Sequence, residues 1–311
     1  MGPYAGVLQS DPARLILLIQ HLGLVGYGEV GRILASGLRP AVVDVRAWDL
    51  KFAESAGGAA LSDHAAQAGV VACGSMQSLC AASDLVISAV TASSTLAVAK
   101  EAARWIRPGT VFLDLNSASP GTKQAAASLL GAVGGCYVEA GVMTSVPPHG
   151  IRVPMLLGGA QAAELATVLN AWGMNATPVS DRIGVASAIK MCRSVMIKGL
   201  EALVMESYAT ARAYGVEDHM IPTLQETFPG IDWQQQGAYF FSRVVQHGQR
   251  RAEEMREAAN TVREAGFEPF MATAIADKQQ WVADQARTGA FSEVATGARW
   301  QEYADQLVRK P

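Results

Sequence analysis

Three glycines near the start of the sequence have the spacing of a phosphate-binding turn. Gly26, Gly28 and Gly31 follow a short apolar run and precede a segment with helical spacing. In such a turn the first glycine permits a tight bend, the second lets a pyrophosphate approach bare backbone, and the third packs the helix closely. The helix start adds free N–H groups and a partial positive charge, which attract phosphate. The motif therefore predicts a dinucleotide site that includes Glu29 and Val30.

An acidic residue lies where such a site needs one. Residues 41–49 are predicted to form the next strand, which ends in Asp49, 18 residues after Gly31. An acid about 20 residues beyond the turn accepts hydrogen bonds from the adenosine ribose, so Asp49 favours NAD over NADP. Asp49 could instead only cap a loop. Asp44 and Lys51 keep NADP as the alternative, since the Lys51 ammonium could meet a 2′-phosphate.

Candidate binding residues also lie where two later apolar segments end. Asn116 and Ser117 follow one of them, and Val90 and Thr91 lie at the end of another. Ligands of a doubly wound sheet bind at the carboxyl ends of its strands. We therefore predict that Asn116 and Ser117 contact substrate, and that Asn116, Val90 and Thr91 contact the cofactor. An Asx or serine turn before Pro120 would also explain the first pair.

Short apolar segments alternate with alanine-rich helical stretches through the first 182 residues. The predicted strands are 22–25, 41–49, 70–72, 85–90, 111–115, 137–140 and 153–157. Strands that alternate with helices are typical of an α/β fold with a doubly wound parallel sheet. We predict a Rossmann-type dinucleotide-binding domain at 21–182, preceded by an N-terminal extension at 1–20.

The pattern changes in the rest of the chain. Residues 186–214 contain no proline and a single glycine and are apolar on most faces, which predicts one long buried helix. Charged amphipathic stretches follow at 240–265 and 272–287, and Pro222 is expected to interrupt this region. We therefore predict an all-helical domain at 183–311, whose apolar helix faces would suit a homodimer interface.

The composition excludes several kinds of partner. The net charge is −3 and the pI is about 6.0, so there is no large positive field to neutralise nucleic-acid phosphates. The four cysteines form no CxxC pair, which favours reduced structural thiols and the cytoplasm over a disulfide framework or a zinc site. The apolar run at 15–19 is far shorter than the roughly 20 residues of a membrane span. We predict a cytoplasmic globular protein that binds a small molecule and has no nucleic-acid, membrane or metal partner.

Four segments together resemble the β-hydroxyacid dehydrogenase and 6-phosphogluconate dehydrogenase superfamily, and the likeness spans nearly the whole chain from residue 22. In the family's order they are 26–31 (GYGEVG), 114–120 (DLNSASP), 139–144 (EAGVMT) and 184–190 (GVASAIK). The resemblance implies an oxidoreductase that transfers hydride between a nicotinamide cofactor and a small hydroxy acid or a related carbonyl compound.

Lys190 matches the lysine that these enzymes place beside the substrate hydroxyl, near the start of the long helix. When hydride leaves carbon, a proton leaves oxygen, so the site needs a base there, or an ammonium that polarises the carbonyl in reduction. A lysine can serve in either role if burial lowers its pKa toward neutrality. Lys190 is the one charged residue between Gly184 and Met191, although a side chain snorkelling from a helix start would give the same pattern.

The substrate motifs depart from those of the family. Hydroxyacid dehydrogenases carry a Ser-Gly-Gly clamp for the substrate carboxylate where this chain has Met143, Thr144 and Ser145. The asparagine expected one turn after the lysine is Ser194, which shares the helix face of Lys190 and can still hydrogen-bond substrate or lysine. These four positions are the remaining predicted substrate contacts, and their departures leave the substrate unnamed.

Two other functions stay open. An imine reductase of similar fold commonly carries Asp or Tyr at the position of Lys190, so this lysine counts against it. A protein that binds dinucleotide without turnover would not need Lys190. Asn116-Ser117 looks like the Asn-Ser pair of 6-phosphogluconate dehydrogenases, but the altered motifs and short C-terminal domain disfavour that substrate and its decarboxylation. The leading prediction is an NAD(P)-dependent dehydrogenase with Lys190 as acid/base.

Overall fold

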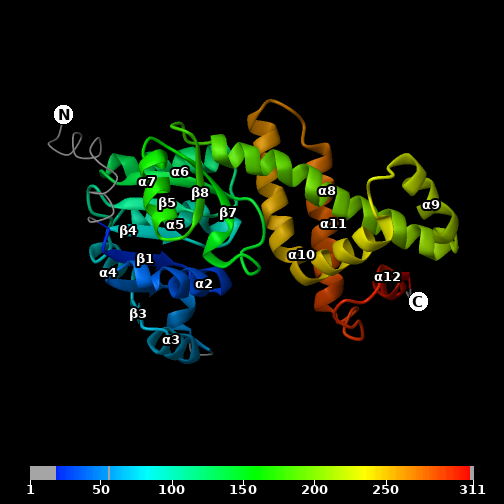
Figure 1. The fold of residues 1–311 in the computed structure, drawn as a ribbon, viewed down its shortest axis with the longest axis horizontal. Coiled ribbons are helices and arrows are strands. Elements are labelled where there is room, and N and C mark those ends of the chain that lie inside the picture. Colours follow the sequence, from blue (N-terminus) through cyan, green and yellow to red (C-terminus); the bar gives the residue numbers. More distant parts are fainter. Residues whose placement is uncertain (1–18, 55–56, 309–311) are drawn as a thin grey trace. The chain divides into compact units, whose positions relative to one another are not determined.

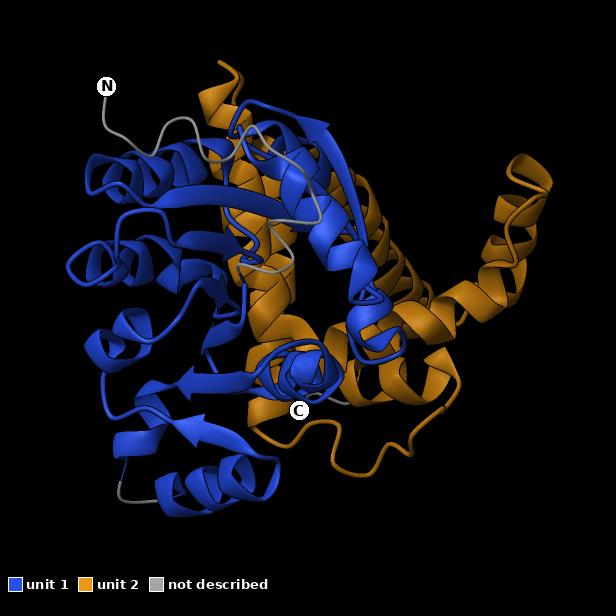
Figure 2. Cartoon of the chain, turned by 60° about the vertical axis from the view of Figure 1, so that its left-hand side comes forward, with its two compact units in different colours: residues 1–190 blue, residues 191–311 orange. Residues whose placement is uncertain are grey.

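The chain divides into two compact units, residues 1–190 and 191–311 (Figure 2). The computed structural model describes residues 19–54 and 57–308, so most of the predicted N-terminal extension, 1–18, lies outside the described residues. The division falls inside helix α8 (Val185–Tyr214) and not at residue 182. The first turn of α8 is hydrogen-bonded to Glu139 of the first unit, which accounts for this difference.

The first unit is built on one eight-stranded sheet in the order β3-β2-β1-β4-β5-β6-β7-β8 (Figure 1). The strands are β1 (His21–Val25), β2 (Asp44–Trp48), β3 (Val70–Ala72), β4 (Leu85–Ser88), β5 (Val111–Asp114), β6 (Cys136–Val142), β7 (Pro154–Gly158) and β8 (Asn175–Ser180). All neighbours are parallel except β6 and β7. The predicted α/β doubly wound fold is confirmed, because the first six strands have the Rossmann order 3-2-1-4-5-6.

Two details of the sheet differ from the prediction. The expectation of an entirely parallel sheet is wrong at β7, because only a loop and the short 3-10 turn η4 (Gly150–Arg152) join it to β6, and no helix carries the chain back across the sheet. Strand β8 was not predicted. It is largely exposed and contains Pro178, as an edge strand can.

Helices flank this sheet and bury both of its faces. They are α2 (Glu29–Leu38), α3 (Gly58–Gln67), α4 (Met76–Ala81), α5 (Thr95–Ala102), α6 (Pro120–Ala132) and α7 (Ala162–Ala171). Consecutive residues of β5 enter different core clusters, Phe112 one and Leu113 the other, because side chains alternate across a strand. Burial on both faces explains why the central strands read as continuous apolar runs.

Among its described residues, the second unit contains helices joined by loops and no strand. It comprises most of α8 together with α9 (Glu217–Thr227), α10 (Trp233–Glu264), α11 (Phe270–Arg287) and α12 (Trp300–Val308). Pro222 was expected to interrupt this region but lies inside α9. A proline removes a single backbone donor, and the burial of its neighbour Ile221 in the helical core favours continuation of the helix. Among the described helices, none combines the length and apolarity that a membrane crossing requires.

Candidate active site

The glycine turn has the geometry that a pyrophosphate requires. Gly26 has a φ of 95°, and a Cβ there would lie 2.5 Å from the carbonyl oxygen of Ala89. A Cβ on Gly31 would collide with the carbonyl oxygen of Gly26. A Cβ on Gly28, by contrast, would enter open space. The first and third glycines are therefore needed to form the turn, and the second leaves room above it.

The first turn of α2 completes this cradle. Its N-cap, Gly28, supplies no side-chain acceptor, and Glu29 and Val30 follow it in the first turn. The N–H groups that begin a helix have no partner within the helix, and they carry the positive end of its dipole. Open space next to uncapped N–H groups fits a bound phosphate.

Asp49 lies directly after β2, at the same end of the sheet. Its Oδ2 accepts a hydrogen bond from the Tyr27 backbone N–H at 2.7 Å, and its Oδ1 accepts one from the Lys51 N–H at 2.9 Å. Asp49 therefore caps the 3-10 turn η2 (Leu50–Ala53), as the loop interpretation expects, and also holds the glycine turn. Asp44 begins β2 and pairs with Arg46 at 2.8 Å, so it lies at the opposite end of the strand.

Asn116 joins the ends of β4 and β5. The side chain is buried; its Oδ1 accepts from the Val90 N–H at 2.7 Å, and its Nδ2 donates to Ser88 Oγ at 3.0 Å. The structure thus brings Asn116 and Val90 together. Thr91 is exposed, and its hydroxyl lies 3.0 Å from that of Ser94, the last residue of the 3-10 turn that follows it.

Lys190 and Ser117 are 73 residues apart in sequence, yet they meet in the first unit. Lys190 Nζ donates to Ser117 Oγ at 2.5 Å, and both side chains are half-buried. Gly141 of β6 permits this approach: a Cβ there would lie 2.9 Å from the Ala186 carbonyl oxygen and 3.4 Å from Lys190 Cβ. An amine is therefore held against a hydroxyl just beyond the carboxyl end of β5.

A buried ionic cluster supports the turn that carries Ser117. Lys123 and Asp114 are almost fully buried, with 3.0 Å between Nζ and Oδ1. Tyr137 donates its phenol to Asp114 Oδ2 at 2.6 Å, and the Asn116 N–H donates to Oδ1 at 2.9 Å. Burial is the main cause, and the nearby Asp114 carboxylate the second, of a pKa for the Tyr137 phenol that lies well above its usual range. Sequence reasoning missed this cluster, since no spacing in the chain marks Lys123 as buried.

The remaining predicted substrate contacts lie on two elements. Met143, Thr144 and Ser145 follow β6; the Met143 N–H is bonded to the Pro154 carbonyl oxygen at 2.9 Å, and Thr144 is exposed. Ser194 is buried on α8, one turn after the lysine. Contact of these residues with a substrate stays a prediction.

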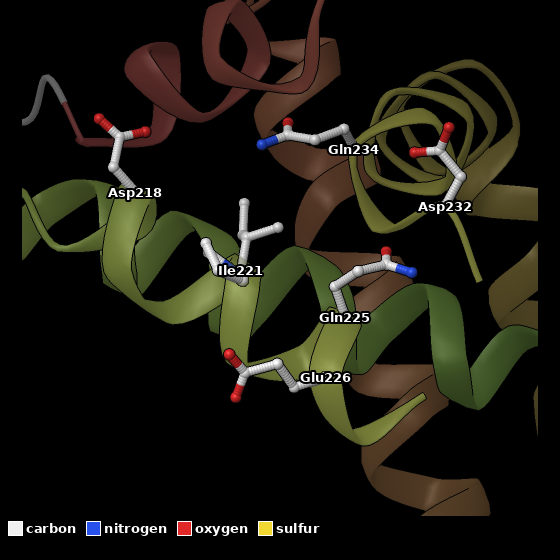
Figure 3. Close-up of a pocket in the computed structure, with 7 residues that line it drawn as sticks. Asp218, Ile221, Gln225, Glu226, Asp232 and Gln234 are labelled. Atoms are coloured by element: carbon white, nitrogen blue, oxygen red, sulfur yellow. The ribbon is translucent and has the colours of Figure 1, made fainter. Parts of the chain in front are cut away.

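A cavity of about 560 Å³ lies within the second unit (Figure 3). Its lining residues come from α9 and from the beginning of α10, and they are Asp218, Ile221, Pro222, Gln225, Glu226, Asp232 and Gln234. Three of these side chains are acidic and none is basic. Carboxylates repel anions, so this cavity does not suit a dinucleotide or a carboxylate ligand.

Two family models match the chain. Residues 21–180 match the NAD binding domain of 6-phosphogluconate dehydrogenase, which is more than half of the chain. Residues 211–282, in the helical unit, match a domain of unknown function, DUF1932.

Solved structures resemble nearly the full length of the chain. A conserved hypothetical protein from Sinorhizobium meliloti 1021 is 37% identical with a TM-score of 0.74, over 94% of this chain and 96% of that one. A 3-hydroxyisobutyrate dehydrogenase from Mycobacterium tuberculosis, with L-serine, is 17% identical with a TM-score of 0.69, over 94% and 100%. A reductive aminase from Aspergillus terreus, with NADPH4, cyclohexanone and allyl amine, is 19% identical with a TM-score of 0.54, over 94% and 100%. The last two likenesses show the fold alone.

The open space at Gly28 gives a direct test of the turn. Gly28→Ala should leave the free energy of unfolding nearly unchanged, because the new methyl meets no atom and the φ of −73° suits any residue. It should weaken dinucleotide binding at least about tenfold, or about 1.4 kcal/mol, because the methyl occupies the space of the pyrophosphate. Isothermal titration with NAD and NADP measures this. Gly131→Ala, equally open but on α6, is the matched control; equal affinities in both variants would refute the assignment.

Proposed function

The chain belongs to the β-hydroxyacid dehydrogenase and 6-phosphogluconate dehydrogenase-like superfamily, with a first unit that matches a nicotinamide-dinucleotide-binding domain, and from this premise we propose an NAD(P)-dependent dehydrogenase. Its reaction transfers hydride between nicotinamide and a small hydroxy acid or related carbonyl compound. The observation that carries the proposal is the hydrogen bond from Lys190 Nζ to Ser117 Oγ. It lies at the carboxyl edge of the sheet, where the glycine turn also lies.

Lys190 performs the proton transfer in this proposal. A nicotinamide dinucleotide bound at the glycine turn would supply the hydride acceptor or donor. In oxidation the neutral amine of Lys190 removes the proton of the substrate hydroxyl, and in reduction its ammonium returns a proton to that oxygen. Ser117 holds the amine in place, and Asn116, Thr144 and Ser194 are the proposed substrate contacts. Met143 and Ser145, in place of the family's glycine-rich clamp, set the substrate choice.

Removal of the lysine tests the proposed function. Once a panel of hydroxy acids has given a substrate, Lys190→Ala should lower kcat/KM about 10³-fold, as expected for loss of a general acid/base. The Kd of the dinucleotide should not change, because the glycine turn and Asp49 are untouched. Absorbance of the reduced nicotinamide measures turnover, and fluorescence titration measures binding.

Two controls sharpen this experiment. Lys190→Arg keeps a positive charge but cannot act as a base near neutral pH, so it should be nearly as inactive as Lys190→Ala. Lys100→Ala, an exposed lysine on α5, should retain full activity. Full hydride transfer by Lys190→Ala would exclude the assignment. Turnover of imines but not of carbonyl compounds would favour the imine reductase, and binding without any turnover would favour a non-catalytic dinucleotide-binding protein.

We propose NAD as the preferred cofactor, on account of Asp49. Its carboxylate lies beside the glycine turn, where it can accept from a ribose hydroxyl and would repel a 2′-phosphate. A hydrogen bond to a charged group contributes roughly 1.5–3 kcal/mol, so Asp49→Asn should lower the preference for NAD over NADP at least about tenfold. The test is to measure the Kd of NAD and the Kd of NADP for the wild-type protein and for Asp49→Asn. A wild-type protein that binds NADP more tightly than NAD would contradict the proposal.

We also propose a homodimer formed through the helical unit. Met196 and Leu203 are 74% and 55% exposed and lie seven residues apart on α8, hence on one face. A glutamate in this apolar face would oppose association, so Leu203→Glu should sediment as a monomer at concentrations where the wild-type protein is a dimer. Val43→Glu changes an exposed valine directly before β2 and should stay dimeric. A monomeric wild-type protein would rule out the dimer.

A further inference from the structure

Glu139 is buried completely, and its carboxylate binds the beginning of α8. Oε1 accepts hydrogen bonds from the N–H groups of Gly184 at 2.7 Å and Ala186 at 3.0 Å. Oε2 accepts from the Ser187 hydroxyl at 2.7 Å. Gly158 of the neighbouring strand makes room for this carboxylate, since a Cβ there would lie 2.6 Å from Oε1.

This arrangement differs from an ordinary helix cap. A local N-cap side chain stabilises a helix but moves with it. Glu139 belongs to β6, 45 residues before Gly184, so its hydrogen bonds fix the helix start to the sheet. Lys190 follows Ala186 by four residues and therefore lies on the same face of α8, one turn further on. Gly141, two residues after Glu139, brings the backbone of β6 against the same turn.

The partner of the lysine is fixed from the neighbouring strand in a similar way. Asp114 is the register partner of Glu139 on β5. It accepts from the Asn116 N–H and so holds the turn that presents Ser117. Two buried carboxylates at adjacent positions of the sheet thus hold the two sides of the hydrogen bond between Lys190 and Ser117.

We infer that Glu139 is a positioning residue for Lys190, which places the amine by binding the first turn of α8. The inference rests on the proposed function of Lys190. Without the carboxylate, the N–H groups of Gly184 and Ala186 lose their acceptor in a buried site, whereas the Ser187 hydroxyl keeps the Gly184 carbonyl oxygen at 3.2 Å. The helix start then shifts so that the two N–H groups find other acceptors. A displacement of about 1 Å at a reacting group can cost about 100-fold in rate.

Three variants test the inference by kinetics. Glu139→Ala should lower kcat about 100-fold while the Kd of the dinucleotide stays unchanged. Glu139→Gln keeps an oxygen for the two N–H groups and an amide for Ser187, so it should restore kcat to within about tenfold of wild type. Asp232→Ala removes the capping carboxylate of α10 and should leave kcat unchanged. A folded Glu139→Ala protein with wild-type kcat, or a Gln variant as impaired as the Ala variant, would overturn the inference.

A second measurement needs no substrate. The rate at which acetic anhydride labels Lys190, followed by mass spectrometry across a pH series, reports how the amine is held. The profile should change in Glu139→Ala and match wild type in Glu139→Gln. If Glu139→Ala does not fold, Ser187→Ala can be used instead. It removes one of the three hydrogen bonds to Glu139 and should shift the pH dependence of Lys190 labelling. An unchanged profile overturns the role of Glu139, whereas absence of turnover in the wild-type protein would count against the proposed function alone.

Discussion

The hydrogen bond between Lys190 and Ser117 depends on how closely the first turn of α8 approaches the carboxyl edge of the sheet. That approach is determined by the bare backbone of one residue of β6 and by the buried carboxylate of another. Gly141 has no side chain to hold the helix away, and Glu139 supplies the acceptors that the helix start lacks. A buried carboxylate that accepts three hydrogen bonds is a strong and directional constraint. The rest of the proposed site is arranged around the amine that this constraint places.

The parallel sheet brings the other parts of the site to the same edge. Strands β1, β2, β4 and β5 run in one direction, so the glycine turn, Asp49, Val90 and Asn116 all follow strand ends on one side. Each turn is fastened to a neighbour: Asp49 to the Tyr27 N–H and Asn116 to the Val90 N–H. The side chains of Asp49 and Asn116 therefore fix the spacing between adjacent turns. Such fastening preorganises a binding edge before any ligand arrives.

Local patterns in the sequence were sufficient for the parts of the fold that depend on neighbouring residues. The glycine spacing predicted a turn in which Gly26 indeed has a positive φ, and apolar runs located seven of the eight strands. The reversed direction of β7 was missed because it depends on the connection and not on the strand itself. Strand β8 was missed because an exposed edge has no apolar run.

The support of the site was harder to read from the chain. Lys190 was singled out by its apolar surroundings and by its resemblance to a family motif, and the structure adds its contact with Ser117. Glu139 begins one of the segments that resemble the family, and Lys123 lies in none of them. Neither residue was expected to be buried, because a charged residue in a strand or helix is ordinarily exposed. Their partners lie 45 and nine residues away, and only the folded chain brings them together. Long-range burial of charge is what the sequence alone conceals.

The most direct measurement is a crystal structure of the protein with a dinucleotide and an unreactive hydroxy-acid analogue. The account predicts the pyrophosphate on the turn from Gly26 to Gly31, and the reacting carbon of the analogue about 3–3.5 Å from nicotinamide C4. The oxygen on that carbon should lie about 2.6–3.2 Å from Lys190 Nζ. A nicotinamide bound at this edge with the analogue's oxygen far from Lys190 would contradict the central claim.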